Sequence, residues 1–400
     1  HDRPYSQITR AVNDGWRRAG RPASELTTRS TVAGYFAFGR SRLDEELLVA
    51  IVRALHPDPG YAERWRHVLR AIRGASTAAA FVRTRSGLPD APEPFVGRET
   101  ELTRLTQLAA TSPVVVIEGM AGVGKTWLAA RAARRIAVRA TSWYRLHLHA
   151  DLRGHDPDSP PADPSAVLAD FLRHLGVRGD QIPPSLAGRI REYRARLRDR
   201  PALIVLDNAA TAEHVEALLP ADPSSLVLVT TRRAAGAPPS CARLRLDGLA
   251  DAESLDLLGR TAGKGRIEAD VEIARRIAAL VGNLPLALSI IGAHLRSHPD
   301  WPLGDYLHRA TALALENGVR TALARSDREL PATTRRVLRF LALHPGRDID
   351  PAEAAALADL PRAEVHRHLE ELAAAHLLRR IGTDRYALPE LARAYAAERI

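Results

Sequence analysis

Glycines, a lysine and a hydroxyl residue occur at one point of the chain in a spacing that suits phosphate binding. Residues 119–126 read GMAGVGKT and match the pattern G-x-x-x-x-G-K-[ST]. In such a segment Gly122 and Gly124 allow the backbone N–H groups to turn around the phosphates. Lys125 then places an ammonium between the outer phosphates, and the hydroxyl of Thr126 is a ligand for Mg²⁺. The segment therefore predicts a site for a nucleoside triphosphate and Mg²⁺.

Two further polar residues follow apolar segments and suit the same chemistry. Asp207 ends the segment ALIVLD, where a carboxylate is expected to complete the Mg²⁺ site. Asn208 comes next, and because an amide is a poor base, we expect slow hydrolysis. Arg232 follows the segment LVLVTT, and a guanidinium at the end of a strand can reach a γ-phosphate. We expect Lys125, Asp207 and Arg232 to be the catalytic residues.

The order of the elements around these residues indicates an α/β fold with an open parallel sheet. From residue 95 onward, apolar segments that suit strands alternate with segments that suit helices. Runs such as VVVI and LIVL are typical of strands that are covered on both faces. The expected strands are 113–118, 142–150, 202–206, 225–230 and 243–247. The expected helices between them are 124–138, 164–175, 186–199 and 211–219.

Helical segments flank this sheet on both sides. The amphipathic segments before it are 7–19, 22–28, 30–38, 44–55 and 60–73. The helices expected after it are 251–260, 268–282, 284–296 and 303–316, and a small β-wing is expected at 379–387. We therefore predict five parts, which are a helical domain 1–75, a linker 76–93, a nucleotide-binding domain 94–250, a helical domain 251–317 and a last domain 318–400.

The first domain resembles a repressor-type helix-turn-helix bundle and holds a large share of the basic excess. It contains 13 Arg against 8 Asp and Glu, a net charge of +5, which is half of the net charge of +10 of the whole chain. If its third helix is the recognition helix, Arg29, Ser30 and Thr31 can reach base edges. Arg40 and Arg42 would then contact phosphates. The alternative is a small helical adaptor that binds protein, with its arginines on a solvated face.

Five sequence motifs, taken in their order along the chain, resemble those of the NB-ARC class of signal-transducing (STAND) NTPases. They are particularly similar to those of the AfsR-type regulators of actinomycetes. They are PFVGRE at 94–99, GMAGVGKT at 119–126, LIVLDN at 203–208, LVTTRR at 228–233 and GNLPLAL at 282–288. The resemblance covers residues 94–400. It implies a P-loop NTPase sheet with strand order 5-1-4-3-2, followed by a helical domain and a winged-helix domain.

The resemblance also implies roles for particular residues. Val96 and Arg98 would border the adenine and the ribose, and Pro285 would close over the adenine. Arg232 would sense the γ-phosphate of ATP. Thr126 and Asp207 would hold Mg²⁺. The expected nucleotide contacts are Val96, Arg98, Gly119, Met120, Ala121, Gly122, Val123, Gly124, Lys125, Thr126 and Pro285.

The chain departs from this family in a motif of the winged-helix domain. In the family, a Met-His-Asp-like motif contacts ADP and holds the closed state. The segment DRYALPEL at 384–391 aligns with it, but Pro389 takes the place of the histidine and Glu390 that of the aspartate. Because proline has no donor for a β-phosphate oxygen, we expect ADP to be held less tightly than is usual in the family.

Composition argues against several other classes of protein. No apolar run reaches the roughly 18–20 residues of a membrane span, and the N-terminal residues lack the apolar core of a signal peptide. We therefore expect a cytoplasmic protein without membrane contact. The one cysteine, Cys241, excludes a disulfide scaffold or a cysteine-rich zinc site. His147 and His149 share one face of an expected strand without a partner ligand, so we expect no metal there.

Together these observations predict an ATP/ADP-switched transcriptional regulator. It would bind an adenine nucleotide with Mg²⁺, hydrolyse ATP slowly, bind double-stranded DNA through its first domain and self-associate in the ATP state. One alternative is a turning-over, AAA+-like ATPase of the replication-initiator kind, which also joins such a domain to a winged helix. The other is a defence or scaffold protein whose first domain binds a protein partner.

Overall fold

A computed structural model of the chain divides it into two compact units, His1–Ala78 and Ala79–Ile400, each with its own core. The residues described are 4–36, 44–56, 61–62, 65, 82–89, 95–139, 143–156, 159–233, 236, 238, 240–346 and 348–400. Within these ranges, none of the helices combines the length and the hydropathy that a membrane crossing requires.

The first unit is a small cluster of helices. Its elements are α1 (Tyr5–Arg18), the 3-10 helix η1 (Ala23–Glu25), α2 (Arg29–Gly34) and α3 (Glu45–Leu55). Its core joins Ile8 and Val12 of α1, Val32 of α2, and Leu47 and Ile51 of α3. The spacing of four residues in α1 and in α3 places each pair on one helix face, so that the three helices share a core.

The helix predicted at 22–28 is wrong, because only Ala23–Glu25 form a turn, the 3-10 helix η1. The backbone of Thr27 pairs instead with the side chain of Asn13. The Asn13 amide donates to the Thr27 carbonyl and its oxygen accepts from the Thr27 N–H, both at 2.9 Å. Such side-chain bonds compete with helical ones and hold this segment extended.

The helix that follows is shorter than the sequence indicates. The predicted helix 30–38 is observed as α2, which begins at Arg29 and ends at Gly34, a residue that weakens helices. Thr28 caps it by accepting a hydrogen bond from the Thr31 N–H at 3.2 Å. Most of the predicted helix 60–73 lies outside the described residues.

The second unit contains a six-stranded sheet with the order β1-β3-β4-β5-β2-β6. Its strands are β1 (Arg83–Ser86), β2 (Val114–Glu118), β3 (Leu146–Asp151), β4 (Ala202–Ala209), β5 (Leu226–Thr231) and β6 (Ala242–Arg245). Strands β2 to β6 pair in parallel. When these five strands are numbered 1 to 5 along the chain, their order across the sheet is 5-1-4-3-2. Strand β5 therefore lies between β2 and β4.

Strand β1 lies in the segment 76–93 that the sequence analysis assigned to a linker, and this assignment is wrong for residues 83–86. These residues form an edge strand that pairs antiparallel with β3, with Arg83 opposite Asp151. The sequence RTRS has no apolar alternation because most of its side chains are exposed at the edge of the sheet. Without that alternation, the usual signal for a strand is missing.

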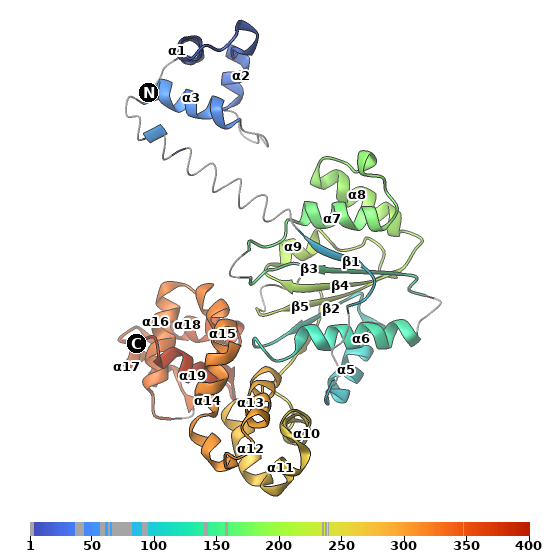
Figure 1. The fold of residues 1–400 in the computed structure, drawn as a ribbon, viewed down its shortest axis with the longest axis vertical. Helices are drawn as coiled ribbons and strands as arrows, with labels where there is room; N and C mark the ends of the chain where they lie inside the picture. The colour runs from blue at the N-terminus through green and yellow to red at the C-terminus, as the bar shows by residue number, and fades with distance from the viewer. Residues whose placement is uncertain are drawn as a thin grey trace. The chain divides into compact units, whose positions relative to one another are not determined.

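Helices cover both faces of this sheet (Figure 1). Alternate residues of β4 divide between the faces, with Leu203 and Val205 in one core and Ile204 and Leu206 in the other. The first core is covered by α5 (Glu99–Thr111) and α6 (Lys125–Arg139). The second is covered by α7 (Pro164–His174), α8 (Leu186–Leu197) and α9 (Ala212–Glu216), and the exposed turn η2 (Gly179–Gln181) connects α7 to α8. This burial on both faces explains the continuous apolar runs.

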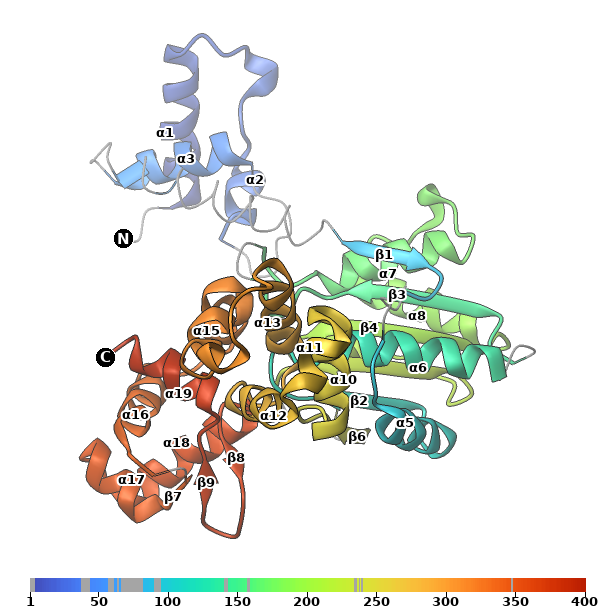
Figure 2. The ribbon, with the colours of Figure 1, turned by 60° about the horizontal axis from the view of Figure 1, so that its bottom comes forward.

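Helices continue the first of these cores toward the C-terminus (Figure 2). They are α10 (Asp251–Ala262), α11 (Lys264–Ala269), α12 (Val271–Leu280), α13 (Pro285–Ser297), the 3-10 helix η4 (Leu303–His308), α14 (Ala310–Ala314), the π-helical turn η5 (Leu315–Val319), α15 (Arg320–Arg328), α16 (Ala332–Leu343), α17 (Pro351–Ala358), α18 (Arg362–Ala374) and α19 (Glu390–Ala397). A three-stranded antiparallel sheet accompanies the last helices, in the order β7 (Asp348–Ile349), β9 (Tyr386–Ala387) and β8 (Arg379–Arg380).

Candidate functional site

The segment between β2 and α6 forms a loop whose backbone has the shape that phosphate binding requires. Gly122 and Gly124 have φ angles of 83° and 96°, which residues with a Cβ rarely adopt. A Cβ on Gly122 would also lie 3.1 Å from the side chain of Leu286, at the start of α13. The N–H of Leu286 donates to the Gly122 carbonyl at 3.3 Å, so α13 begins directly against the loop.

Lys125 is buried at the base of this loop. Its ammonium donates to the carbonyls of Gly119 at 2.7 Å and Met120 at 2.9 Å. Its pKa is lowered to about 7, mainly by burial and also by repulsion from Arg232, while attraction to Asp207 partly opposes both effects. An anion beside the ammonium would favour its charged form and raise this pKa again.

A cluster of oxygen atoms from three elements lies beside the lysine. The hydroxyl of Thr126 donates to the Asp207 carboxylate at 2.9 Å, and that of Thr230 donates to it at 2.5 Å. The Thr230 hydroxyl also accepts from the Asn208 N–H at 2.9 Å. Hydroxyl and carboxylate oxygens are suitable Mg²⁺ ligands. Among the described residues no group of three or more His, Cys, Asp or Glu side chains that could hold a metal ion occurs, so a Mg²⁺ ion at Thr126 and Asp207 would need further oxygen ligands.

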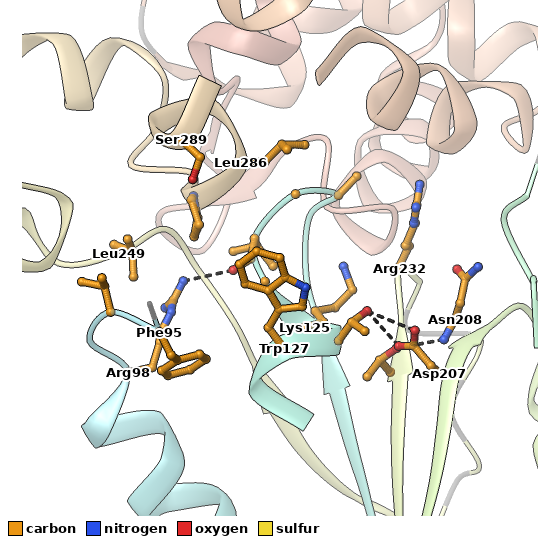
Figure 3. Close-up of a pocket in the computed structure, with 18 of the residues that line it drawn as sticks. Phe95, Arg98, Lys125, Trp127, Asp207, Asn208, Arg232, Leu249, Leu286 and Ser289 are labelled. Carbon is orange, nitrogen blue, oxygen red and sulfur yellow. Dashed lines mark hydrogen bonds between the residues drawn. The ribbon is translucent and has the colours of Figure 1, made fainter. Parts of the chain in front are cut away.

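Arg232 follows β5 and therefore lies between the phosphate loop after β2 and Asp207 on β4 (Figure 3). Its guanidinium donates to the carbonyl of Ala322 in α15 at 3.3 Å. Burial lowers its pKa to about 10, and repulsion by Arg325 adds to this effect. The geometry thus brings two cationic side chains, Lys125 and Arg232, close to two that could bind Mg²⁺, Thr126 and Asp207, at one end of a cavity where an anion can be held.

The other end of the same cavity is apolar. The cavity has a volume of about 400 Å³, and Phe95, Val96, Leu249, Pro285 and Leu286 contribute its apolar walls. Figure 3 shows Phe95 and Leu249 at the opposite end from Asp207. An elongated cavity with cations at one end and apolar side chains at the other suits a nucleotide, because the phosphates and the base need opposite surroundings.

Arg98 lines this cavity, but its guanidinium is already engaged. It donates to the carbonyls of Asp247 at 2.6 Å, Val123 at 3.3 Å and Gly248 at 3.4 Å, and it pairs with Glu101 at 2.5 Å. The residue is 4% exposed. Arg98 therefore joins the phosphate loop to the segment after β6, and the role that the sequence suggested at the ribose stays a prediction.

Of the residues that the sequence analysis expects to contact the nucleotide, all but two line this cavity. Those that line it are Val96, Arg98, Ala121, Gly122, Val123, Gly124, Lys125, Thr126 and Pro285. Gly119 and Met120 do not, since their carbonyls accept from Lys125 beneath the loop. Trp127 also lines the cavity, although the sequence analysis did not single it out. Its position directly after Thr126 could have indicated that it lies near the nucleotide.

Pro389 and Glu390 of the winged-helix motif that departs from the family lie outside this cavity. They line a second cavity of about 1150 Å³, together with Met120 and His376. Burial, reinforced by repulsion from Arg245, lowers the pKa of His376 to about 4. The motif that departs from the family thus approaches the phosphate loop from the side of Met120.

The residues predicted to contact DNA lie in the first unit. Arg29 and Ser30 are exposed in the first turn of α2. The hydroxyl of Thr31 lies 2.8 Å from that of Thr28 and so takes part in the cap of the helix. Arg40 and Arg42 lie outside the described residues.

We expect Arg98→Ala to lower the free energy of unfolding by about 2–3 kcal/mol, because three backbone carbonyls, one of them buried, would lose their donor. Urea denaturation followed by circular dichroism measures the change. Arg104→Ala, on the exposed side of α5, is the control and should stay within about 0.5 kcal/mol of wild type. Equal unfolding midpoints for the two variants would contradict the structural role of Arg98.

Comparison with known proteins identifies similar sequences. Residues 94–266 match the model of the AAA ATPase domain family. The chain is 31% identical over 405 residues to the regulatory protein AfsR of Streptomyces coelicolor, and 32% identical over 398 residues to that of Streptomyces griseus. Each alignment covers 95% of this chain and 39% of the relative, so the chain spans about two fifths of these curated proteins.

A solved structure supports the fold. A Walker-type ATPase of Pyrococcus abyssi superposes with a TM-score of 0.56 at 14% identity, over 80% of this chain and all of that one. At this identity the likeness concerns the fold alone. The chain is therefore similar to the regulatory protein AfsR over most of its own length, and its residues 94–266 match the AAA ATPase domain.

Proposed function

We propose that the protein is a transcriptional regulator of the NB-ARC (STAND) type that is switched by ATP and ADP. The observation that carries this proposal is the convergence of Lys125, Thr126, Asp207 and Arg232 at one end of the cavity. The similarity to AfsR over 95% of the chain supports the regulatory role. The protein binds its nucleotide between the parallel sheet and the start of α13.

Different residues of the cavity bind different parts of the nucleotide. The backbone of 121–125 and the Lys125 ammonium hold the phosphates, and Val96 and Pro285 border the adenine. Thr126 and Asp207 hold Mg²⁺, which neutralises phosphate charge when it is bound. Arg232 contacts the γ-phosphate in the ATP state alone. This difference in contacts between ATP and ADP is what shifts the protein between its two states.

Residues 318–400 act as a winged-helix domain in this proposal, with the β8–β9 hairpin as the wing. The Pro389 side chain offers no donor to a β-phosphate, so ADP is held less tightly than in the family. Self-association in the ATP state follows from the exposure of a face when the domains rearrange.

Lys125→Ala should weaken the binding of MgATP and MgADP at least about tenfold, since it removes a charge-assisted contact. Isothermal titration calorimetry on the whole chain measures the affinities. The matched control is Lys264→Ala, because Lys264 is the other lysine and its side chain is 84% exposed. Absence of binding to the wild type, with its pocket shown to be free of nucleotide, would refute the proposal.

The pH dependence of nucleotide binding gives a second test of the role of the Lys125 ammonium. Its pKa of about 7 in the free protein means that binding above pH 7 must take up a proton. Affinity should therefore fall as pH rises from 7.5 to 9, by at most about tenfold per unit for one proton. Calorimetry in buffers of different ionisation enthalpy measures the proton uptake. Lys125→Ala should show neither effect, and a flat profile for the wild type would contradict this assignment.

Hydrolysis should be slow, because Asn208 offers no carboxylate beside Asp207. We expect kcat to lie well below the ~1 s⁻¹ at the low end of ordinary enzymes, as measured by phosphate release at saturating MgATP. Asn208→Asp should raise kcat, because aspartate tolerates the φ of 60° and supplies a base. Rapid turnover by the wild type would instead favour the AAA+-like ATPase, which the AAA domain match keeps as the second candidate.

In this proposal the first unit regulates transcription by binding double-stranded DNA through α2. Binding to a mixed-sequence duplex should weaken steeply with salt, with a slope of about −0.9 per phosphate contacted, and Arg29→Ala should weaken it further. Fluorescence anisotropy measures both effects. Arg10→Ala, on the exposed side of α1, is the control. No binding to any duplex, with nucleotide binding intact, would favour the defence or scaffold protein.

A further inference from the structure

A second carboxylate, that of Asp151, lines the nucleotide cavity beside Asp207. Asp151 ends β3, and in the parallel pairing of β3 with β4 it lies opposite Asp207. Paired positions of neighbouring strands place their side chains on the same face of the sheet, and such strands are about 4.8 Å apart. The two carboxylates therefore lie next to each other at the edge of the sheet that carries the site.

The backbone that follows Asp151 is fastened to the same end of β4. The N–H of Leu152 donates to the Asp207 carbonyl at 2.9 Å, and the N–H of Gly154 donates to the Asn208 carbonyl at 2.7 Å. A Cβ on Gly154 would lie 2.5 Å from the Asn208 carbonyl oxygen, so this close approach requires glycine. These contacts hold Asp151 in a fixed place beside Asp207.

One oxygen of the Asp151 carboxylate is available to a ligand in the cavity. The described residues give this carboxylate one hydrogen bond, in which Oδ1 accepts from the Arg153 N–H at 2.9 Å. An ionised carboxylate can accept hydrogen bonds at both of its oxygens. The Oδ2 atom can therefore accept one from a water molecule.

The other polar side chains of the cavity are poorly suited to activate a water molecule. Among the described residues that line it, the carboxylates are those of Asp151 and Asp207, and none of these residues is a histidine. In the proposed function Asp207 holds Mg²⁺, and Asn208 offers an amide, which is a poor base. Asp151 is thus the described side chain of the cavity that is best suited to polarise a water molecule.

We propose that Asp151 is a catalytic residue that orients the water molecule that attacks the γ-phosphate of ATP. This inference rests on the proposed function and assigns its slow hydrolysis to a carboxylate on the strand next to β4. Oδ2 accepts a hydrogen bond from the water and turns a lone pair of the water toward the γ-phosphorus. The water oxygen bonds to this phosphorus, the bond to the oxygen that bridges the β- and γ-phosphates breaks, and ADP leaves with that electron pair. The proton of the water passes along the hydrogen bond and on to the solvent.

The position of β3 in the sheet agrees with slow hydrolysis. In the order β2-β5-β4-β3, Asp151 lies one strand farther from the phosphate loop than residue 208 does. A carboxylate at position 208 would reach the water beside the γ-phosphate more directly. The gain expected for Asn208→Asp and the role of Asp151 are therefore compatible.

The test separates hydrolysis from binding on variants of the whole chain. Phosphate release is measured in single turnovers with protein in excess over MgATP. Calorimetry measures the affinities for MgADP and for a non-hydrolysable ATP analogue with Mg²⁺. Asp151→Asn should lower the rate of hydrolysis at least about tenfold and leave both affinities within about twofold, because the amide keeps the size of the side chain but is a poor base. Asp151→Asn combined with Asn208→Asp should recover the rate, since a carboxylate is again present at the ends of these strands.

Asp199→Asn is the matched control, because Asp199 is exposed after α8 and does not line the cavity, and it should change neither the rate nor the affinities. A rate for Asp151→Asn within about twofold of the wild type would overturn the role of Asp151. Binding of ATP by the wild type without hydrolysis above the background of Lys125→Ala would also overturn it. A loss of rate together with a weaker, Mg²⁺-dependent affinity would identify a metal ligand instead, and would likewise overturn it. Failure of the wild type to bind either nucleotide would refute the proposed function itself, so the two failures are distinguishable.

Discussion

The parallel pairing of β2, β5 and β4 is the constraint on which the rest of the structure depends. Val116 pairs with Val229, and Leu206 pairs with the same residue from the other side. This register brings the carboxyl ends of three strands to one edge, where Lys125, Arg232 and Asp207 follow them. The helices on both faces keep the strands in place and exclude water, so the charged groups at this edge act in a medium where they interact strongly.

The sequence predicted the parts of this site that depend on short-range geometry. The glycines and Lys125 belong to one turn between a strand and a helix, and their spacing alone determines how they meet. The polar edge strand β1 was missed, and the helix predicted at 22–28 was too long, because the conformations of these segments depend on distant partners, β3 in one case and Asn13 in the other. Local patterns of apolar residues carry no record of such contacts.

The same reason applies to the contacts of Arg98. Arg98 follows a recognisable segment, yet its guanidinium donates to carbonyls some 150 positions later in the chain. The role of this residue arises from tertiary packing, and the order of residues along the chain does not reveal which distant elements become neighbours.

The hydrogen bonds of Arg98 and Leu286 have a mechanical consequence. Arg98 joins the phosphate loop to the connection between β6 and α10, while Leu286 joins the same loop to α13. These two separate ties fasten the start of the bundle α10–α13 to the phosphate loop at the edge of the sheet. A rearrangement of the kind proposed above would keep both ties intact only if it pivoted beyond α13, where the π-helical turn at Leu315–Val319 interrupts the regular helical path.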